Sequence, residues 1–381
     1  MPDTTHSTAE PAATDDLFRF ADDLGPAKII HITQPSLGLR AILVVDNVAC
    51  GPSIGGARMA PDVSVEECFR LARAMTFKNA AAGLPHGGGK SVIVADPAMP
   101  LTDKQVVIRA FARAIGDISD YIVGPDMGTD ERCMAWAKDE IDRAVGLPRE
   151  IGGIPLDEIG ATGYGVAVAG EVAQEFAGIA LEGARVVVQG FGAVGRHAAR
   201  FLVEKGAILV GASDSRGTIS APDGLDLDAL LRIKRDGGGV IDSTAGTKAD
   251  RDAIVDIACD IWIPAARPDV VRADNVDRLD TKLILQGANI PITADAEASL
   301  HARGILSVPD FIANAGGVIC AAVEYTGGTE TAAIATIDEK VRRNTEEVLT
   351  AARDKAVQPR EAAIAMARDR VERAMTYRRD S

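Results

Sequence analysis

Segments with apolar residues at helical spacing alternate with short apolar runs along most of this chain. Two such runs, residues 28–33 and 40–45, predict strands near the N-terminal end. Between residues 64 and 82 the apolar side chains recur at steps of three and four, which predicts a helix. Ser64 and Glu67 fit a capping box at the start of this helix, and Gly83 and Pro85 predict its end.

The pattern beyond this helix divides the chain into two parts. Residues 87–90 read GGGK and precede a strand-like run at 91–95, after which we expect a helix at 103–118 and a strand at 121–124. Residues 146–159 are rich in Gly, Pro and Ile, and we place a domain boundary there. From residue 161 helices and strands alternate, which predicts a doubly wound sheet. The predicted helices of this part are 163–178 and 193–205, and the predicted strands are 184–189, 207–213, 261–264, 283–286 and 305–308.

The expected fold class is therefore α/β with two domains, which suits a length of 381 residues. The first domain spans residues 15–155, and a Rossmann-type, doubly wound domain spans residues 156–330. Helices at 331–356 and 360–376 belong to a C-terminal part, residues 331–381, which we expect to pack back on the first domain. The polar and acidic residues 1–16 predict a mobile tail rather than a signal peptide.

Composition and charge exclude several classes of function. Hydrophobic residues make up 47% and charged residues 25%, as in ordinary soluble proteins, and no apolar run approaches the length of a membrane span. The net charge of -14 argues against nucleic acid or an anionic membrane as a partner. The five cysteines are scattered without a CxxC pair, which argues against disulfides and a metal site and favours a cytoplasmic protein.

A dinucleotide-binding pattern, GxGxxG, follows the apolar run VVVQ and opens an amphipathic helix. Gly190 permits the tight turn, Gly192 lets the backbone approach a pyrophosphate, and Gly195 lets the helix pack on the strand. The helix N-terminus supplies free N–H groups to the phosphates. The loop residues that we expect to bind the coenzyme are Gly190, Phe191, Gly192, Ala193, Val194 and Gly195.

Asp214 and Ser215 end the next predicted strand, near the position where such domains bind the adenosine ribose. A carboxylate there favours the free 2′-hydroxyl of NAD, whereas Arg216 would suit the 2′-phosphate of NADP, so NAD is the expected coenzyme and NADP the alternative. The other interpretation is a tight turn without a ligand.

Two lysines, Lys78 and Lys90, flank a Gly-rich stretch at residues 87–89 that we interpret as a turn. Three consecutive glycines cost backbone entropy on folding, so a close approach of the backbone is expected, with a ligand as the obvious candidate. Mutual repulsion and burial would depress a lysine pKa, so that one lysine transfers protons while the other holds an anion. The alternative is a pair of solvated surface lysines.

Asp126 follows a short predicted strand on a turn with Gly and Pro, which would place its carboxylate in a cleft. The alternative is that Asp126 caps a helix at residues 130–145.

Together these segments resemble the glutamate/leucine/phenylalanine/valine dehydrogenase family, from about residue 51 to residue 324. The resemblance implies a substrate-binding and oligomerisation domain followed by an NAD-binding domain, in a homo-oligomer that is a hexamer or an octamer. It also implies an NAD(P)-dependent enzyme that oxidises an L-amino acid to its 2-oxo acid and ammonia, reversibly. The motifs that carry it, besides the lysine stretch, are GGAR at 55–58, PDMGT at 125–129, ATGYG at 161–165, QGFGAVG at 189–195, SDS at 213–215, GAN at 287–289 and PDFIANAGGV at 309–318.

The resemblance also implies roles for individual residues. Lys78 would hold the substrate α-carboxylate, Lys90 would polarise the carbonyl and activate water, and Asp126 would shuttle protons. Thr162 and Asn289 would contact the nicotinamide end of the coenzyme. Further residues expected along the substrate cleft are Gly55, Asn314, Gly316, Gly317 and Val318.

Two positions of the family pattern concern the side chain of the substrate. Glutamate-specific members have a lysine where this chain has Ile54 and a serine where it has Ala321. Burying a carboxylate against these apolar residues would cost several kcal/mol, which favours leucine, valine or phenylalanine slightly over glutamate. His86, just before the GGGK run, is either a polar group in the pocket or a satisfied histidine facing the cleft. The alternative of another class is a non-catalytic regulator that binds NAD(H), since a fold alone does not fix a function.

Overall fold

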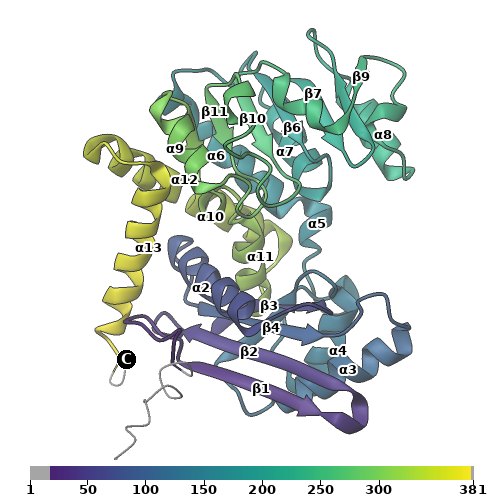
Figure 1. The fold of residues 1–381 in the computed structure, drawn as a ribbon, viewed down its shortest axis with the longest axis vertical. Helices are drawn as coiled ribbons and strands as arrows, with labels where there is room; N and C mark the ends of the chain where they lie inside the picture. The colour runs from purple at the N-terminus through teal and green to yellow at the C-terminus, as the bar shows by residue number, and fades with distance from the viewer. Residues whose placement is uncertain (1–17, 379–381) are drawn as a thin grey trace, which may run out of the picture.

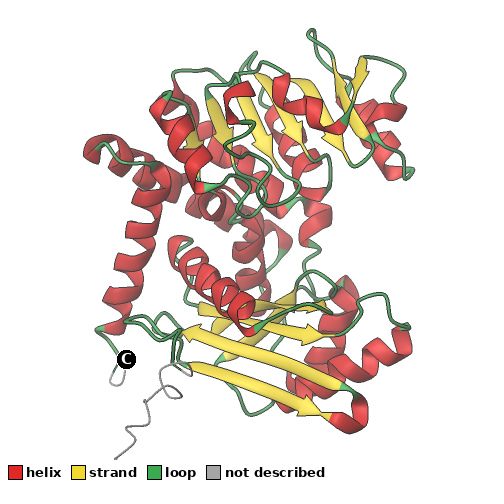
Figure 2. Ribbon diagram, in the orientation of Figure 1, coloured by secondary structure: helices red, strands yellow, loops and turns green. Residues whose placement is uncertain are grey.

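The computed structural model describes residues 18–378, which form two lobes, each with its own β-sheet (Figure 1). The expected tail at residues 1–16 lies outside the described residues. Figure 2 shows helices on both faces of each sheet and between the lobes. The two-domain α/β fold predicted from the sequence is confirmed.

The first lobe contains a five-stranded sheet in the order β1-β2-β4-β3-β5. β1 and β2 pair antiparallel, as do β2 and β4, whereas β3 pairs parallel with both β4 and β5. The strands are β1 (Lys28–Gln34), β2 (Leu39–Asn47), β3 (Ser53–Ala60), β4 (Gly87–Val94) and β5 (Tyr121–Pro125). The helices of this lobe are α2 (Val65–Ala81), α3 (Leu101–Ala114) and α4 (Glu131–Ile141).

Alternation along these strands separates two faces of the sheet. Ala57 and Met59 of β3, with Tyr121 and Val123 of β5, join α3 and α4 in one hydrophobic core. The residues between them point to the other face, where Val92 of β4 packs with α2. Because α2 lies mainly over β2 and β4, the same face of β3 and β5 is turned toward the second lobe.

The second lobe contains a seven-stranded sheet in the order β12-β11-β10-β6-β7-β8-β9. The strands from β12 to β7 are parallel, and β8 and β9 add antiparallel pairs at one edge. Its strands are β6 (Arg185–Gln189), β7 (Ile208–Asp214), β8 (Gly217–Ser220), β9 (Thr247–Ala249), β10 (Ile261–Pro264), β11 (Leu283–Leu285) and β12 (Leu306–Val308). The β6–α7–β7 unit is the predicted dinucleotide-binding arrangement, with α7 at Ala193–Val203.

The other helices of the second lobe flank the sheet or lead toward the first lobe. They are α5 (Leu156–Ile159), α6 (Ala161–Ala177), α8 (Leu227–Arg235), α9 (Ala294–Ala302), α10 (Asp310–Ala313) and α11 (Gly316–Tyr325). The C-terminal helices are α12 (Glu330–Lys355) and α13 (Pro359–Met375). Among the residues described, no helix is both long and apolar enough to cross a membrane.

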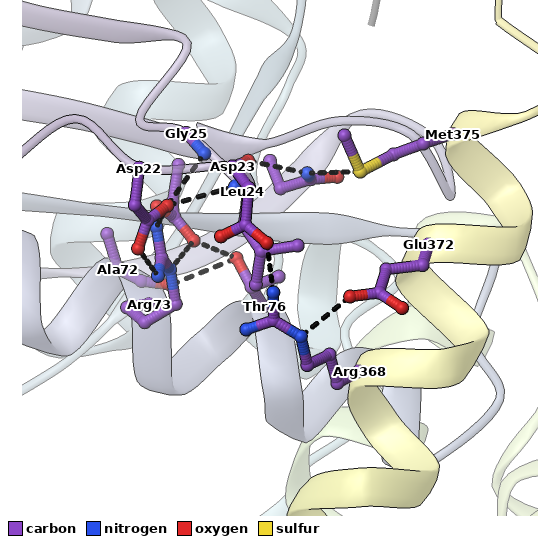
Figure 3. Close-up of polar contacts among 12 residues, drawn as sticks. Asp22, Asp23, Leu24, Gly25, Ala72, Arg73, Thr76, Arg368, Glu372 and Met375 are labelled. Carbon is purple, nitrogen blue, oxygen red and sulfur yellow. Dashed lines mark hydrogen bonds and ion pairs between the residues drawn. The ribbon is translucent and has the colours of Figure 1, made fainter.

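The C-terminal helices contact the first lobe at the end of α2. Lys340 of α12 donates to the carbonyl of Gly83 at 2.9 Å, and Arg370 of α13 donates to the carbonyl of Ala81 at 2.6 Å. The last carbonyls of a helix lack partners within it, so these cations stabilise the end of α2. Also on α13, Arg368 forms an ion pair with Asp23 in the segment that precedes β1 (Figure 3).

Several elements differ from those predicted. Residues 87–89, interpreted as a turn, are the start of β4, and β3, β8, β9 and α8 were not predicted. Helix α3 begins and ends earlier than expected, and the helix predicted at 130–145 ends at Ile141. β3 escapes the pattern because its sequence SIGGARMA has two glycines and no apolar alternation, yet it lies buried between two parallel neighbours.

Candidate active site

The strand pattern brings four polar groups to the face of the first sheet that is turned toward the second lobe. Lys90 comes from β4, Arg58 from β3, and Asp126 from the residue after β5. Lys78, three residues before the end of α2, approaches from the side of the helix. The region where one domain faces another is a common location for a catalytic site.

Lys90 and Asp126 form an ion pair through Nζ and Oδ2, with side chains that are only 6% and 17% exposed. The other oxygen of Asp126 accepts a hydrogen bond from Arg58 Nε at 2.9 Å, and Arg58 also pairs with Glu67 at 2.5 Å. Burial would raise the pKa of Asp126, but the charges and hydrogen bonds of Lys90 and Arg58 outweigh it and hold the pKa below its usual value. Asp126 is therefore a carboxylate between two cations, and Lys90 is not a solvated surface lysine.

The glycines around this site are needed for protein packing rather than for a ligand, which corrects our expectation for residues 87–89. A Cβ on Gly88 would lie 2.0 Å from the backbone nitrogen of Thr76, so the glycine lets α2 touch β4. A Cβ on Gly55 would lie 1.6 Å from the carbonyl oxygen of Gly89 on the neighbouring strand. These approaches bring α2, with Lys78, close to the strand that carries Lys90.

Lys78 reaches across to the second lobe. Its Nζ donates to Asn314 Oδ1 at 2.6 Å, while Asn289 Oδ1 lies at 3.5 Å. Burial, together with the charge of Lys90, lowers the pKa of Lys78 to about 8, although the carboxylate of Asp310 opposes the shift. The depression of a lysine pKa that we expected from sequence is thus present at Lys78, which remains an anion-binding cation below that pH.

An apolar cluster lies beside these polar groups. Ile54 of β3 and Ile122 of β5 pack with Val145, and Ala321 of α11 lies against them. Val318, one turn before Ala321 on the same helix, is partly exposed. The structure therefore brings Ile54 and Ala321 together, as a shared side-chain pocket requires, and adds two residues that the sequence did not single out.

His86 is buried immediately before β4, with 4% of its surface exposed. Its Nδ1 lies 3.0 Å from the carbonyl oxygen of Pro52, which can only accept, so Nδ1 carries the proton. Burial lowers the pKa of His86, and its Nε2 has no hydrogen-bond partner among the described residues. The ring makes an edge contact with Tyr325 of α11 at 5.9 Å between centroids. His86 thus combines a satisfied nitrogen with a free acceptor.

The glycine loop after β6 has the shape that a dinucleotide requires. Gly190 has φ +96 and lies against Ala266, and a Cβ on Gly195 would meet the carbonyl oxygen of Gly190 at 2.1 Å. No atom comes within 4 Å of a Cβ placed on Gly192, the residue before α7, so the helix N-terminus is open to a ligand. At the ends of β6 and β7, Gln189 Oε1 and Ser213 Oγ are buried and find no hydrogen-bond partner within residues 18–378. The loop therefore fits an NAD(P) pyrophosphate.

Asp214, at the end of β7, is already engaged by the protein. Its Oδ2 accepts from Lys234 Nζ at 2.7 Å and from the Val240 backbone at 2.9 Å, and its Oδ1 accepts from the Arg216 backbone at 2.9 Å. Burial would raise the pKa of Asp214, yet these partners lower it, so the group is a carboxylate. Ser215 beside it is exposed. The cation beside this carboxylate, Lys234, would suit the 2′-phosphate of NADP. Asp214 alone therefore does not decide between NAD and NADP.

Other expected residues contact one another in the second lobe. Thr162, at the start of α6, lies 3.0 Å from a Cβ placed on Gly317 of α11, and Asn289 and Asn314 bond to each other at 3.0 Å. The alternative that Asp126 caps the following helix is wrong, because Asp130 is the residue that caps it. Sequence reasoning did not single out Arg58, although it belongs to the quoted GGAR motif. It also missed Lys234 and Asp310.

Two family models together match most of the chain. The model described as glutamate/leucine/phenylalanine/valine dehydrogenase matches residues 152–379. The model described as Glu/Leu/Phe/Val dehydrogenase, dimerisation domain, matches residues 26–143. The first of these matches begins at residue 152 and the second ends at residue 143, so residues 144–151 belong to neither.

Curated relatives carry the names of glutamate dehydrogenases. One from Aeropyrum pernix is 40% identical over 357 residues, covering 87% of this chain and 85% of the relative. An NADP-specific one from Saccharolobus shibatae is 38% identical, with coverages of 87% and 83%. A catabolic NAD-specific one from Bacillus subtilis is 37% identical, with coverages of 73% and 68%. These names do not confirm the slight preference for an apolar amino acid that the sequence predicts.

Solved structures agree with the fold. A hetero-hexameric glutamate dehydrogenase from Thermus thermophilus, in a leucine-bound form, superposes with a TM-score of 0.82 at 26% identity and covers 92% of this chain and 89% of its own. An L-tryptophan dehydrogenase from Nostoc punctiforme gives a TM-score of 0.73 at 24% identity, with coverages of 94% and 99%, which supports the fold alone.

Proposed function

The chain belongs to the glutamate/leucine/phenylalanine/valine dehydrogenase family, and from this membership we propose that Lys78, Lys90 and Asp126 form its catalytic cleft. It is an NAD(P)-dependent amino acid dehydrogenase that acts on a CH–NH₂ donor. The observation that carries the proposal is the buried Lys90–Asp126 ion pair, which faces the second lobe beside Lys78.

Each polar group has a part in this reaction. Lys78 binds the substrate α-carboxylate in place of the amide oxygen of Asn314. Asp126, ionised and fixed by Arg58, accepts a proton from the substrate amino group, and Lys90 orients the water that adds to the α-carbon. A coenzyme held by the glycine loop supplies the hydride acceptor. Exclusion of water by the second lobe strengthens these interactions.

Glutamate is the first candidate substrate, because the relatives described above carry that activity in their names. An acidic side chain would need a cation or several donors at its distal end. The neutral tautomer of His86 offers an acceptor there, and only a protonated imidazole would bind a carboxylate.

An apolar amino acid such as leucine, valine or phenylalanine is the second candidate, favoured by the side chains of the pocket. Ile54, Ile122, Val145 and Ala321 form one apolar cluster. An apolar substrate side chain gains about 25 cal/mol for each Å² that it buries, whereas a carboxylate left unpaired among the same groups loses several kcal/mol.

Initial rates with glutamate, leucine, valine and phenylalanine, each with NAD and with NADP, test both candidates through the absorbance of the reduced coenzyme. A strong preference for glutamate selects the first candidate, and a preference for an apolar amino acid selects the second. If no amino acid is turned over while NADH binds tightly, the proposed catalytic function is refuted and a non-catalytic regulator is favoured.

The coenzyme is NAD, with NADP as the alternative, as among the relatives. We also propose a homo-oligomer, a hexamer or an octamer; the Thermus thermophilus neighbour is itself a hetero-hexamer. Size-exclusion chromatography coupled to light scattering would distinguish a hexamer from an octamer by mass. The five cysteines are free thiols, which suits the proposed cytoplasmic location.

A further inference from the structure

Arg360, the second residue of α13, reaches from the C-terminal helix into the second lobe. Its Nε pairs with Glu297, one terminal nitrogen donates to Asp310 Oδ1 at 2.9 Å, and the other donates to Gln286 Oε1 at 2.8 Å. The two carboxylates are only 5% and 9% exposed. A guanidinium presents its donors in a rigid planar fork, so one side chain can neutralise and fix all three acceptors.

Asp310 connects this network to the loop after β11. Its second oxygen accepts a hydrogen bond from the backbone of Ile290 at 2.9 Å. Ile290 has φ +48, a left-handed conformation that is unfavourable for a β-branched residue and therefore needs support from its surroundings. Asn289, the residue before it, accepts from Asn314 at 3.0 Å and lies 3.5 Å from Lys78. The conformation of this loop thus depends on a carboxylate that Arg360 holds.

Asp310 also acts on Lys78 through its charge. Two charged groups affect Lys78: Asp310 of α10 attracts its ammonium group, and Lys90 of β4, itself paired with Asp126, repels it. Arg360 offsets part of the charge of Asp310. Without that offset, the ammonium group of Lys78 would be attracted more strongly to the carboxylate of Asp310.

We propose that Arg360 is a positioning residue for substrate binding: by holding Asp310 it keeps the Asn289–Ile290 loop in place and leaves Lys78 available to the substrate α-carboxylate. The inference rests on the proposed function, because it takes Lys78 as the carboxylate-binding group. The same helix also supports Lys78 from the other side, since Arg370 donates to the carbonyl of Ala81 at the end of α2.

Three variants of the full chain test this role. Arg360→Met removes the cation and the fork, and Arg360→Lys keeps the cation but cannot hold three acceptors. The control is Arg373→Met, which removes an arginine of α13 that is 72% exposed and forms an ion pair with Asp369 one turn earlier. Folding is checked by circular dichroism and thermal melting, and KM, kcat and the pH profile of kcat/KM are measured with the best amino acid of the panel.

Arg360→Met is expected to raise the KM for the amino acid about tenfold, the scale of a lost charge-assisted hydrogen bond. The fall of kcat/KM at high pH should move to higher pH in this variant, because the full charge of Asp310 then raises the pKa of Lys78. Arg360→Lys should lower kcat/KM while this alkaline limb stays at the wild-type pH, and Arg373→Met should match the wild type in both.

A folded Arg360→Met with the KM and alkaline limb of the control would overturn the inference. If Arg360→Met does not fold, a folded Arg360→Lys with wild-type kcat/KM overturns it instead. A wild-type protein that turns over no amino acid refutes the proposed function, and this result is distinct from the other two.

Discussion

Replacing Asp126 by asparagine tests the centre of the cleft, since it removes one charge at nearly constant volume. Asp126 is the shared partner of Lys90 and Arg58, and all three side chains are at most 20% exposed. Removing one partner of a buried ion pair typically costs about 3–5 kcal/mol, because the remaining charge stays buried without compensation. Loss of a general base lowers turnover about 10²- to 10⁴-fold. Asp126→Asn should therefore be both less stable and nearly inactive.

The pH dependence of this stability loss has a definite sign. Because the folded pKa of Asp126 is depressed, its contribution is complete above the unfolded value of about 3.9 and disappears as the pH falls through the folded pKa. The wild type and Asp126→Asn should therefore differ fully in thermal unfolding at pH 7, and less in strong acid. Melting curves at several pH values, with initial rates at pH 7 and above, provide the assay.

Asp120→Asn is the matched control at the other end of β5. Asp120 pairs with Lys28 at 2.5 Å, but these side chains are 25% and 45% exposed, so the pair is worth at most about 1 kcal/mol. This control should keep its activity and nearly all its stability. The reasoning would be refuted if Asp126→Asn had the same melting temperature as Asp120→Asn, or if it retained more than about a tenth of wild-type turnover.

Three further predictions concern the same cleft and the coenzyme site. Lys90→Ala should abolish turnover while NADH still binds, as fluorescence titration would show; substantial remaining turnover would exclude the role given to Lys90. The kcat/KM for the amino acid should fall above pH of about 8 as Lys78 loses its proton, and Lys78→Met should be weakly active without that limb; a limb that persists in the variant belongs to another group. Lys234→Ala should lower kcat/KM with NADP relative to NAD about tenfold, because it removes the cation paired with Asp214; an unchanged ratio would contradict this.

The sequence is most informative where a local pattern has one physical meaning. The apolar run, glycine loop and amphipathic helix at residues 186–203 correctly predict the β6–α7 unit, since all its determinants are adjacent in the chain. The proximity of Lys78 and Lys90 was also predicted, but for an incomplete reason: the glycines between them serve the contact of Gly88 with Thr76. The ligand assumed there is not needed to explain the stretch.

Interactions between distant segments are what the pattern leaves out. Arg58 and Asp126 are 68 residues apart, and Arg360 and Asp310 are 50 residues apart. The residues next to these arginines in the sequence do not distinguish them from the charged residues that lie on the surface. Their partners are set by strand order and by the path of α13, which no periodicity encodes.

The supports given to α2 by Lys340 and Arg370 constrain how this protein is made on the ribosome. All strands of the first sheet lie within residues 28–125, so the sheet can assemble early in synthesis. The end of its lysine-bearing helix, however, meets partners encoded more than 250 residues later. The nascent first domain therefore lacks both contacts until the C-terminal helices emerge, and a polypeptide shortened by two dozen residues would lack α13 and the hydrogen bond from Arg370 to Ala81.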